Sequence, residues 1–75
     1  MSFDGLVAEL RADFATAAPA DRDLAVQIFG IRHAAELGRH SPNAIAHAAT
    51  GLESYGIEIR RGMRLAPYVL LRVRK

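Results

Sequence analysis

Basic side chains dominate one end of this 75-residue sequence, and their chemistry is that of anion recognition. The guanidinium group of arginine is planar and carries five N–H donors, which suit phosphate groups and the guanine base. The first 36 residues instead hold six acids against three arginines. This polarity favours an anionic partner, most commonly nucleic acid, and the alternative is a solvated basic tail; charge alone does not choose between nucleic acid and the other uses of a basic patch. The bases of residues 59–75, where no acid occurs, are Arg60, Arg61, Arg64, Arg72, Arg74 and Lys75.

Three histidines also have a spacing that suggests chemistry, since His33, His40 and His47 lie seven positions apart. Gly38 and Pro42 interrupt any helix between them, so the three side chains do not share one continuous face. The sequence has no cysteine that could complete a zinc site. We therefore expect no bound metal.

The remaining polar side chains do not indicate catalysis. A hydrolase or a transferase needs a nucleophile, a base and an orienting group that meet in one cleft. Ser41 and Ser54 are better explained as helix caps, and no glycine-rich loop follows a strand to hold a phosphate group. We expect a protein that is not an enzyme and that uses neither a cofactor nor a small-molecule substrate.

Length and composition predict one small domain, residues 1–75, near the lower limit at which a hydrophobic core is stable alone. Apolar residues make up 51% of the sequence, but many are alanines, which bury little surface. Association with a second copy is one way to gain stability. We find no apolar run long enough to span a bilayer and no signal-peptide layout, so we expect a cytoplasmic protein without a membrane partner.

Hydrophobic spacing and capping signals predict a first helix over residues 3–17 and a third over residues 42–50. The third helix begins with the pair Ser41-Pro42, a cap followed by a proline at the first helical position, and ends at Gly51.

A second helix is predicted over residues 20–37, with Gly38 ending it in a left-handed conformation. Gly30 lies inside this helix, where a glycine usually lets another helix approach closely. The residues expected to face the core are Leu24, Ile28, Ile31 and Ala35, with Ala25 and Phe29 beside them.

Residues 53–66 admit two interpretations. As a helix, the segment places its apolar and small residues on one face and its three arginines on the other, with Ile57 among the arginines. As a strand, Gly56–Arg60 alternates between apolar and charged residues, and a turn follows at Arg61-Gly62. The helix accounts for more residues, so we favour it; its inner face would be Tyr55, Ile59, Gly62, Met63 and Ala66, with Gly56 and Gly62 as close-packing positions.

Pro67 blocks continuation of this helix, and the alternation of Tyr68–Arg74 predicts a short β-strand. A single strand leaves backbone groups unpaired, so it needs either Gly56–Arg60 or the same strand of a second copy, which would form a homodimer. The expected fold class is mainly α, a four-helix domain with a short C-terminal β-strand. The alternative is a winged helix with a C-terminal β-hairpin.

The two short helices on either side of Gly51 resemble the helix-turn-helix of phage repressors. Ile45-Ala46 stands at the apolar–alanine pair of the first helix, Ile59 at the buried position of the second, and Gly62 at the end of the second. Gly51 comes one residue late for the turn glycine.

The longer stretch Phe29–Val69 is similar to a small bacterial helix-turn-helix-like domain. This resemblance implies DNA binding, because such domains generally bind DNA, although some serve as protein contacts. The matching groups are Ile28-Phe29-Gly30-Ile31, Ser54-Tyr55-Gly56, Glu58-Ile59, Arg61-Gly62 and Tyr68-Val69.

The resemblance makes residues 53–66 a recognition helix, whose N-terminal residues reach base edges while flanking bases hold phosphates. We expect a DNA-binding protein, such as a transcriptional regulator, that binds duplex DNA as a homodimer. The alternative is a protein-interaction or accessory module of a nucleic-acid-processing system, with Leu65–Val73 as its contact surface. The arginine face would then be solvated and would form pairs such as Glu58 with Arg61. The candidate DNA-binding residues are Glu53, Ser54, Ile57 and Glu58 near the bases, and Arg60, Arg61, Arg64, Arg72 and Arg74 near the phosphates, with one helix arginine as a candidate reader of guanine.

Overall fold

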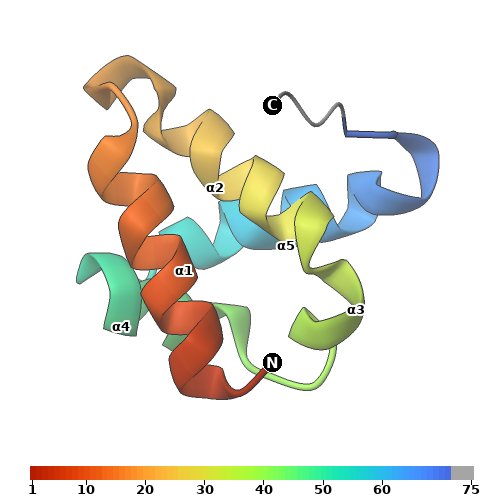
Figure 1. The fold of residues 1–75 in the computed structure, drawn as a ribbon, viewed down its shortest axis with the longest axis horizontal. Coiled ribbons are helices and arrows are strands. Elements are labelled where there is room, and N and C mark those ends of the chain that lie inside the picture. Colours follow the sequence, from red (N-terminus) through yellow and green to blue (C-terminus); the bar gives the residue numbers. More distant parts are fainter. Residues whose placement is uncertain (72–75) are drawn as a thin grey trace.

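Five α-helices and two short 3₁₀ turns make up the regular structure of residues 1–71, the part of the chain that the computed structural model describes. The helices form two layers, with α1 and α2 in front of α4 and α5 in Figure 1 and the short α3 to one side. Within these residues no helix combines the length and the hydropathy needed to cross a membrane. The helices are α1 (Phe3–Thr16), α2 (Arg22–Arg32), α3 (Ala34–Leu37), α4 (Pro42–Thr50) and α5 (Tyr55–Leu65), and the turns are Pro19–Asp21 and Ala66–Tyr68.

The predicted first and third helices are confirmed, and their caps explain where they begin. The side chain of Ser2 accepts a hydrogen bond from the backbone N–H of Gly5 at 3.0 Å, at the start of α1. Ser41 accepts one from Ala44 N–H at 3.2 Å, and Pro42 occupies the first position of α4. Each cap satisfies a backbone donor that has no partner inside the helix.

The single helix predicted over residues 20–37 is wrong in two respects. It divides into α2 and α3 at His33, whose backbone leaves the helical region at φ −115° and ψ 22°. Gly38 ends α3 in a right-handed conformation, φ −61°, and not in the left-handed one that we expected. The break redirects the chain so that Leu37 turns inward and is fully buried.

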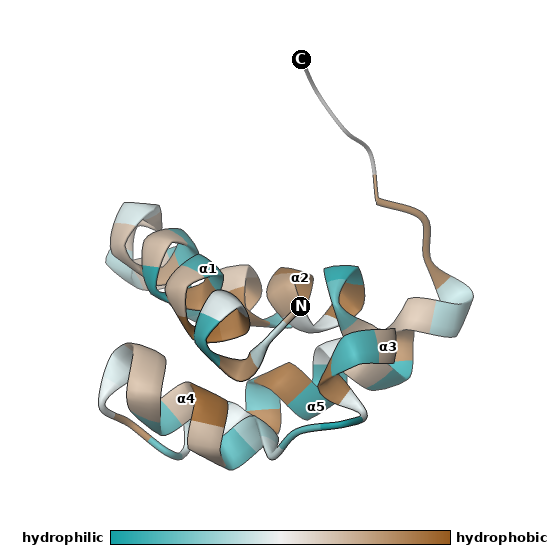
Figure 2. Ribbon diagram, turned by 60° about the horizontal axis from the view of Figure 1, so that its bottom comes forward, coloured by the Kyte–Doolittle hydropathy of each residue, from teal (hydrophilic) through white to brown (hydrophobic). Residues whose placement is uncertain are grey.

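The buried face of α2 also differs from the predicted stripe. Val26, Phe29 and Gly30 are buried, whereas Leu24 is 54% exposed. The face is rotated because α2 packs on both α1 and α5, and the close approach to α5 occurs at Gly30. The apolar core lies between the two layers, as Figure 2 shows, and consists of Leu6, Val7, Leu10, Val26, Phe29, Leu37, Ile45, Ala46 and Ile59.

Two glycines set the distance between α2 and α5. A Cβ atom on Gly30 would overlap the carbonyl oxygen of Ile59 and lie 3.1 Å from Cα of Gly62. A Cβ atom on Gly62 would lie 3.0 Å from Cα of Gly30. The backbones are therefore in direct contact at this crossing, and the predicted close-packing role of both glycines is confirmed.

The predicted C-terminal β-strand, Tyr68–Arg74, is wrong for the part of it that the structure describes. Tyr68 ends the 3₁₀ turn, and residues 69–71 have no regular structure; residues 72–74 lie outside the described residues. The winged-helix alternative is also wrong, because Gly56–Arg60 lies inside α5. A strand requires a neighbouring strand for its backbone groups, and residues 1–71 contain none.

Candidate nucleic-acid interface

A four-residue turn, residues 51–54, joins α4 to α5. Gly51 adopts a left-handed conformation, φ 79°, and its N–H donates to the carbonyl of His47 at 2.9 Å. Thr50 stabilises the turn, since its hydroxyl donates to the Ala46 carbonyl at 2.7 Å and accepts from the N–H of Leu52 at 3.1 Å. Ser54 makes no capping hydrogen bond, so the prediction that it caps a helix is wrong. The result is two short helices across a tight turn.

The N-terminal helix fixes this pair of helices from the side. The guanidinium group of Arg11 on α1 donates to the carbonyl of Ala48 at 3.0 Å, near the C-terminal end of α4. Phe14 on α1 meets Tyr55 on α5 edge to face, with ring centroids 5.0 Å apart. These contacts, together with the crossing of α2 and α5, determine which face of α5 points to solvent.

Helix α5 has the two faces that the favoured interpretation predicts. Gly56, Ile59 and Gly62 are buried, and Tyr55 and Met63 are half-buried against the core. Asn43 of α4 packs so closely on Gly56 that a Cβ atom there would overlap its side-chain oxygen. The exposed residues of α5 are Ile57, Arg60, Arg61, Arg64 and Leu65.

Arg60 lies on the side of α5 that faces α4. One of its guanidinium nitrogens, Nη2, donates to Oδ1 of Asn43 at 2.8 Å. The amide nitrogen of Asn43 donates in turn to Oε1 of the exposed Glu53 at 3.3 Å. The amide thus links Glu53 of the turn with Arg60 of the helix and holds both beside the first turn of α4.

Glu58 lies on the other side of α5, towards α2, and its side chain is only 15% exposed. Gln27 of α2 donates to Glu58 Oε1 at 2.7 Å, and Arg61 Nη1 donates to both carboxylate oxygens, at 3.2 and 3.1 Å. From the sequence we expected Glu58 to pair with Arg61 if the arginine face is solvated, and the pair is present. The contact with Gln27 could not be predicted, because the two residues are 31 positions apart.

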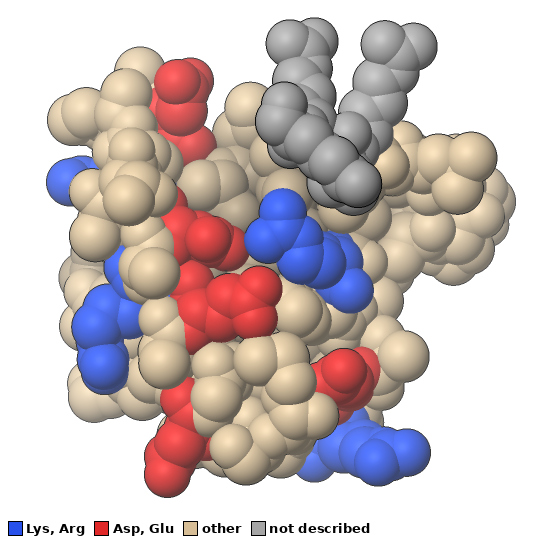
Figure 3. All heavy atoms as spheres, viewed as in Figure 1, with Lys and Arg blue, Asp and Glu red and all other residues tan. Residues whose placement is uncertain are grey.

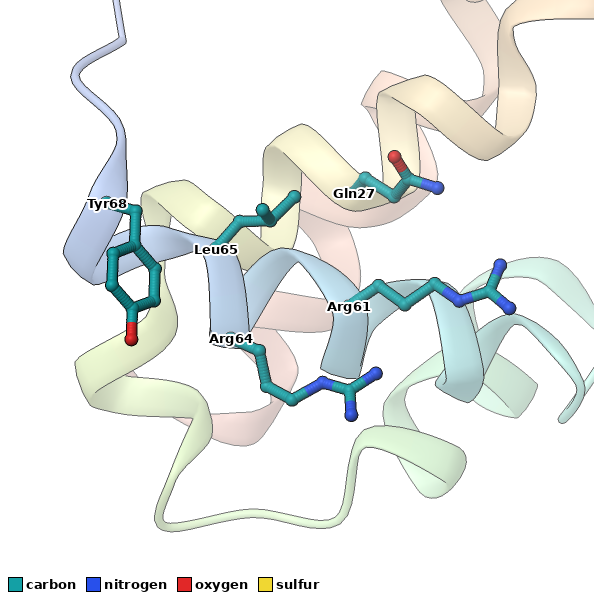
Figure 4. Close-up of a pocket in the computed structure, with 5 residues that line it drawn as sticks. All are labelled: Gln27, Arg61, Arg64, Leu65 and Tyr68. Carbon is teal, nitrogen blue, oxygen red and sulfur yellow. The ribbon is translucent and has the colours of Figure 1, made fainter.

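Two open grooves run along the arginine face of α5, the face that carries Arg60, Arg61 and Arg64. One has a volume of about 300 Å³ and is lined by Ile57, Arg60, Met63 and Arg64. The other, drawn in Figure 4, has a volume of about 330 Å³ and is lined by Gln27, Arg61, Arg64, Leu65 and Tyr68. Arg64 belongs to both grooves and makes no hydrogen bond or ion pair within residues 1–71. An exposed guanidinium group of this kind can bind an anion at little desolvation cost.

Several acids of the N-terminal half are instead involved in contacts within the domain. On the face shown in Figure 3, acidic and basic side chains lie side by side. Arg32 lies 3.7 Å from Glu9 and 3.9 Å from Asp13, and Glu9 also contacts the ring of His33 at 2.9 Å. The N-terminal ammonium group, 2.6 Å from Glu36, lowers the pKa of that carboxyl group below its ordinary value.

The candidate DNA-binding residues of the sequence are thus brought together in part. Seven of them lie on α5 or on the turn before it; six of these are exposed, and Glu58 is largely covered. Arg72 and Arg74 lie outside the described residues. Asn43 and Gln27 were not among the candidates, and both organise charged side chains of the site.

Comparison with known proteins agrees with the geometry of α4, the turn and α5. The family described as HTH-like domain matches residues 2–72, which is nearly the whole chain. Comparison with curated proteins gives no significant match, and comparison with solved structures gives none either. The resemblance to a small helix-turn-helix-like domain is confirmed, and the chain belongs to the family of HTH-like domains.

Proposed function

We propose that this domain binds duplex DNA, with α5 as the helix that enters the major groove. The observation that carries the proposal is the outward face of α5, which presents three exposed arginines on the second helix of a helix-turn-helix. Recognition helices of this motif place their N-terminal part against base edges and use flanking basic residues on phosphates. Membership of the HTH-like family supports the same proposal.

The geometry suggests a role for each part of this face. Ile57, 52% exposed, offers an apolar contact of the kind that suits the methyl group of thymine. Arg60 and Arg64 line the same groove as Ile57, further along α5, and suit phosphate oxygens. Contacts from Ser54 and from the C-terminal Arg72 and Arg74 remain predictions. We propose a binding role without catalysis, such as transcriptional regulation in the bacterial cytoplasm.

Titration of a fluorescent, random-sequence 20-base-pair duplex tests the proposal. The logarithm of the binding constant should fall linearly with the logarithm of salt concentration, with a slope of about −0.9 for each phosphate contacted. Two phosphate contacts, from Arg60 and Arg64, would give a slope of roughly −1.8. Fluorescence anisotropy between 50 and 200 mM salt measures it, and absence of binding at the lowest salt would refute the proposal.

A second candidate function, protein contact, is favoured by the segment that follows α5. Tyr68 is 84% exposed and Leu70 is 98% exposed, with exposed Leu65, Val69 and Leu71 around them. Consecutive exposed apolar residues are typical of contact surfaces. We propose that a second copy covers this segment, which would give the homodimer that many helix-turn-helix proteins use to bind two half-sites.

Sedimentation equilibrium tests this association without DNA. The unchanged chain should show a mass that rises with concentration towards that of a dimer. The Leu70→Asp variant should stay monomeric at the same concentrations, because an acid in the contact surface would be buried without a partner. A chain that is monomeric throughout the range would contradict the proposal, and so would an equally dimeric Leu70→Asp variant.

A further inference from the structure

Three side chains from two helices form a chain of hydrogen bonds beside the arginine face. Gln27 on α2 donates to Glu58 on α5, and Glu58 accepts two bonds from Arg61, one turn further along. The carboxylate is largely covered, whereas the arginine side chain is 55% exposed. An exposed cation is thus held by an anion whose own position is fixed from a neighbouring helix.

This arrangement leaves part of the Arg61 guanidinium group available for a ligand. Both bonds to Glu58 come from Nη1, and Nη2 and Nε donate to no other residue within 1–71. A free arginine side chain loses considerable rotamer freedom on binding, so prior orientation by a carboxylate lowers that cost. Nη2 and Nε can therefore offer two parallel N–H groups, and O6 and N7 of guanine accept hydrogen bonds from such a pair in the major groove.

The position of the guanidinium group along α5 also suits base contact. In Figure 4 the side chain of Arg61 runs along the helix away from Tyr68, towards the N-terminal half. Because it bonds to Glu58, its charged end lies about one turn nearer the helix N-terminus than its own Cα. Recognition helices contact bases with their N-terminal part, and the exposed Ile57 lies in the same turn as Glu58.

The other two arginines have different surroundings. Arg60 is held by the neutral amide of Asn43, and Arg64 has no partner within residues 1–71. Neither is fixed by a charged group, so both suit phosphates, which carry no sequence information directly.

We propose that Glu58, anchored by Gln27, is a positioning residue that orients Arg61 to read a guanine in duplex DNA. This inference rests on the proposed DNA binding and adds the base that the site selects. It has a distinctive consequence, because a carboxylate beside DNA repels phosphates. Removing its charge should strengthen binding to DNA in general while weakening the preference for guanine.

The test is selection from a pool of random 20-base-pair duplexes, followed by sequencing of the bound fraction. The unchanged domain should prefer guanine at one position by about tenfold or more. Glu58→Gln should bind random duplex more tightly and lose most of that preference. Gln27→Met, which changes no charge and keeps a side chain of similar length, should lose part of the preference with random-duplex affinity unchanged.

Arg61→Lys completes the set, since lysine keeps the charge but cannot make the bidentate contact. It should retain affinity for random duplex and lose the guanine preference, with thermal melting confirming that every variant is folded. Guanine preference that survives in Glu58→Gln overturns the inference. Binding without any base preference in the unchanged domain overturns it too, but leaves DNA binding intact. Absence of binding to any duplex overturns both.

Discussion

The Gly62→Ala variant is expected to lose about 2 kcal/mol of its free energy of unfolding, from the addition of a single methyl group. The new Cβ atom would overlap the carbonyl oxygen of Gln27 and lie 2.9 Å from the carbonyl carbon. These are backbone atoms of α2, which cannot rotate aside as a flexible side chain can. The two helices must separate, and the contacts of the buried Ile59 and Phe29 would loosen with them.

The sign of this effect is informative, because helix propensity alone predicts the opposite. Alanine is favoured over glycine inside a helix by about 1 kcal/mol, so an isolated α5 would gain stability from the substitution. We expect overpacking at the crossing to exceed that gain. A loss of about 2 kcal/mol in a domain of this size lowers Tm by roughly 8–16 °C, which thermal melting followed by circular dichroism can measure.

Gly38→Ala is the matched control. Gly38 is exposed and right-handed, φ −61°, and a Cβ atom there would lie 3.5 Å from the nearest atom, the carbonyl oxygen of Ala35. The control should melt at the temperature of the unchanged domain or slightly above it. If Gly62→Ala melts like the control, α2 and α5 do not meet as closely as the structure shows.

Local signals predicted the parts of the fold that depend on local chemistry. The pair Ser41-Pro42 gave the start of α4, and Gly51 gave its end, since capping involves residues a few positions apart. The spacing of the arginines and of Ile59 along α5 likewise predicted both faces of that helix. Periodicity is a property of a single helix, so the sequence of that helix is enough to reveal it.

Two local expectations also failed, the cap at Ser54 and the left-handed end at Gly38. The larger failures concern partners distant in sequence. Alternation over Tyr68–Arg74 is compatible with a strand, but a strand also needs a neighbouring strand, and residues 1–71 supply none. The buried face of α2 depends on where α5 crosses it, at Gly30, and exposed Leu24 shows that an apolar side chain need not face the core. The bond from Gln27 to Glu58 exists only because that crossing occurs.

The close packing of glycines and the candidate interface are therefore linked. With Gly62 and Gly30 in contact, α5 lies close to α2, and Glu58 comes within hydrogen-bonding distance of Gln27. The same orientation buries Ile59 and directs Arg64 outward. Packing in the core thus determines which charged groups a ligand can meet.

The Arg60→Ala/Arg61→Ala/Arg64→Ala variant should bind random duplex DNA on the order of a hundredfold more weakly than the unchanged domain at 0.1 M salt. Each lost phosphate contact removes about 0.9 from the slope of log affinity against log salt, so losing the contacts of Arg60 and Arg64 should make the slope shallower by about 1.8. The variant should remain folded, because all three side chains are exposed and alanine is the strongest helix former. Fluorescence anisotropy across a salt series and circular dichroism measure the two properties.

A pair of single variants distinguishes the loss of a DNA contact on α5 from the loss of one positive charge elsewhere on the domain. Arg64→Ala and Arg32→Ala each remove one positive charge. Arg64 lies on the outward face of α5, whereas Arg32, on α2, is paired with Glu9 and Asp13 of α1. Losing exposed pairs of this kind costs little stability, so both variants should fold. Only Arg64→Ala should change the salt slope, by about 0.9. Equal changes in the two variants would mean that DNA responds to net charge alone, and unchanged affinity in the folded triple variant would mean that α5 is not the helix that binds DNA.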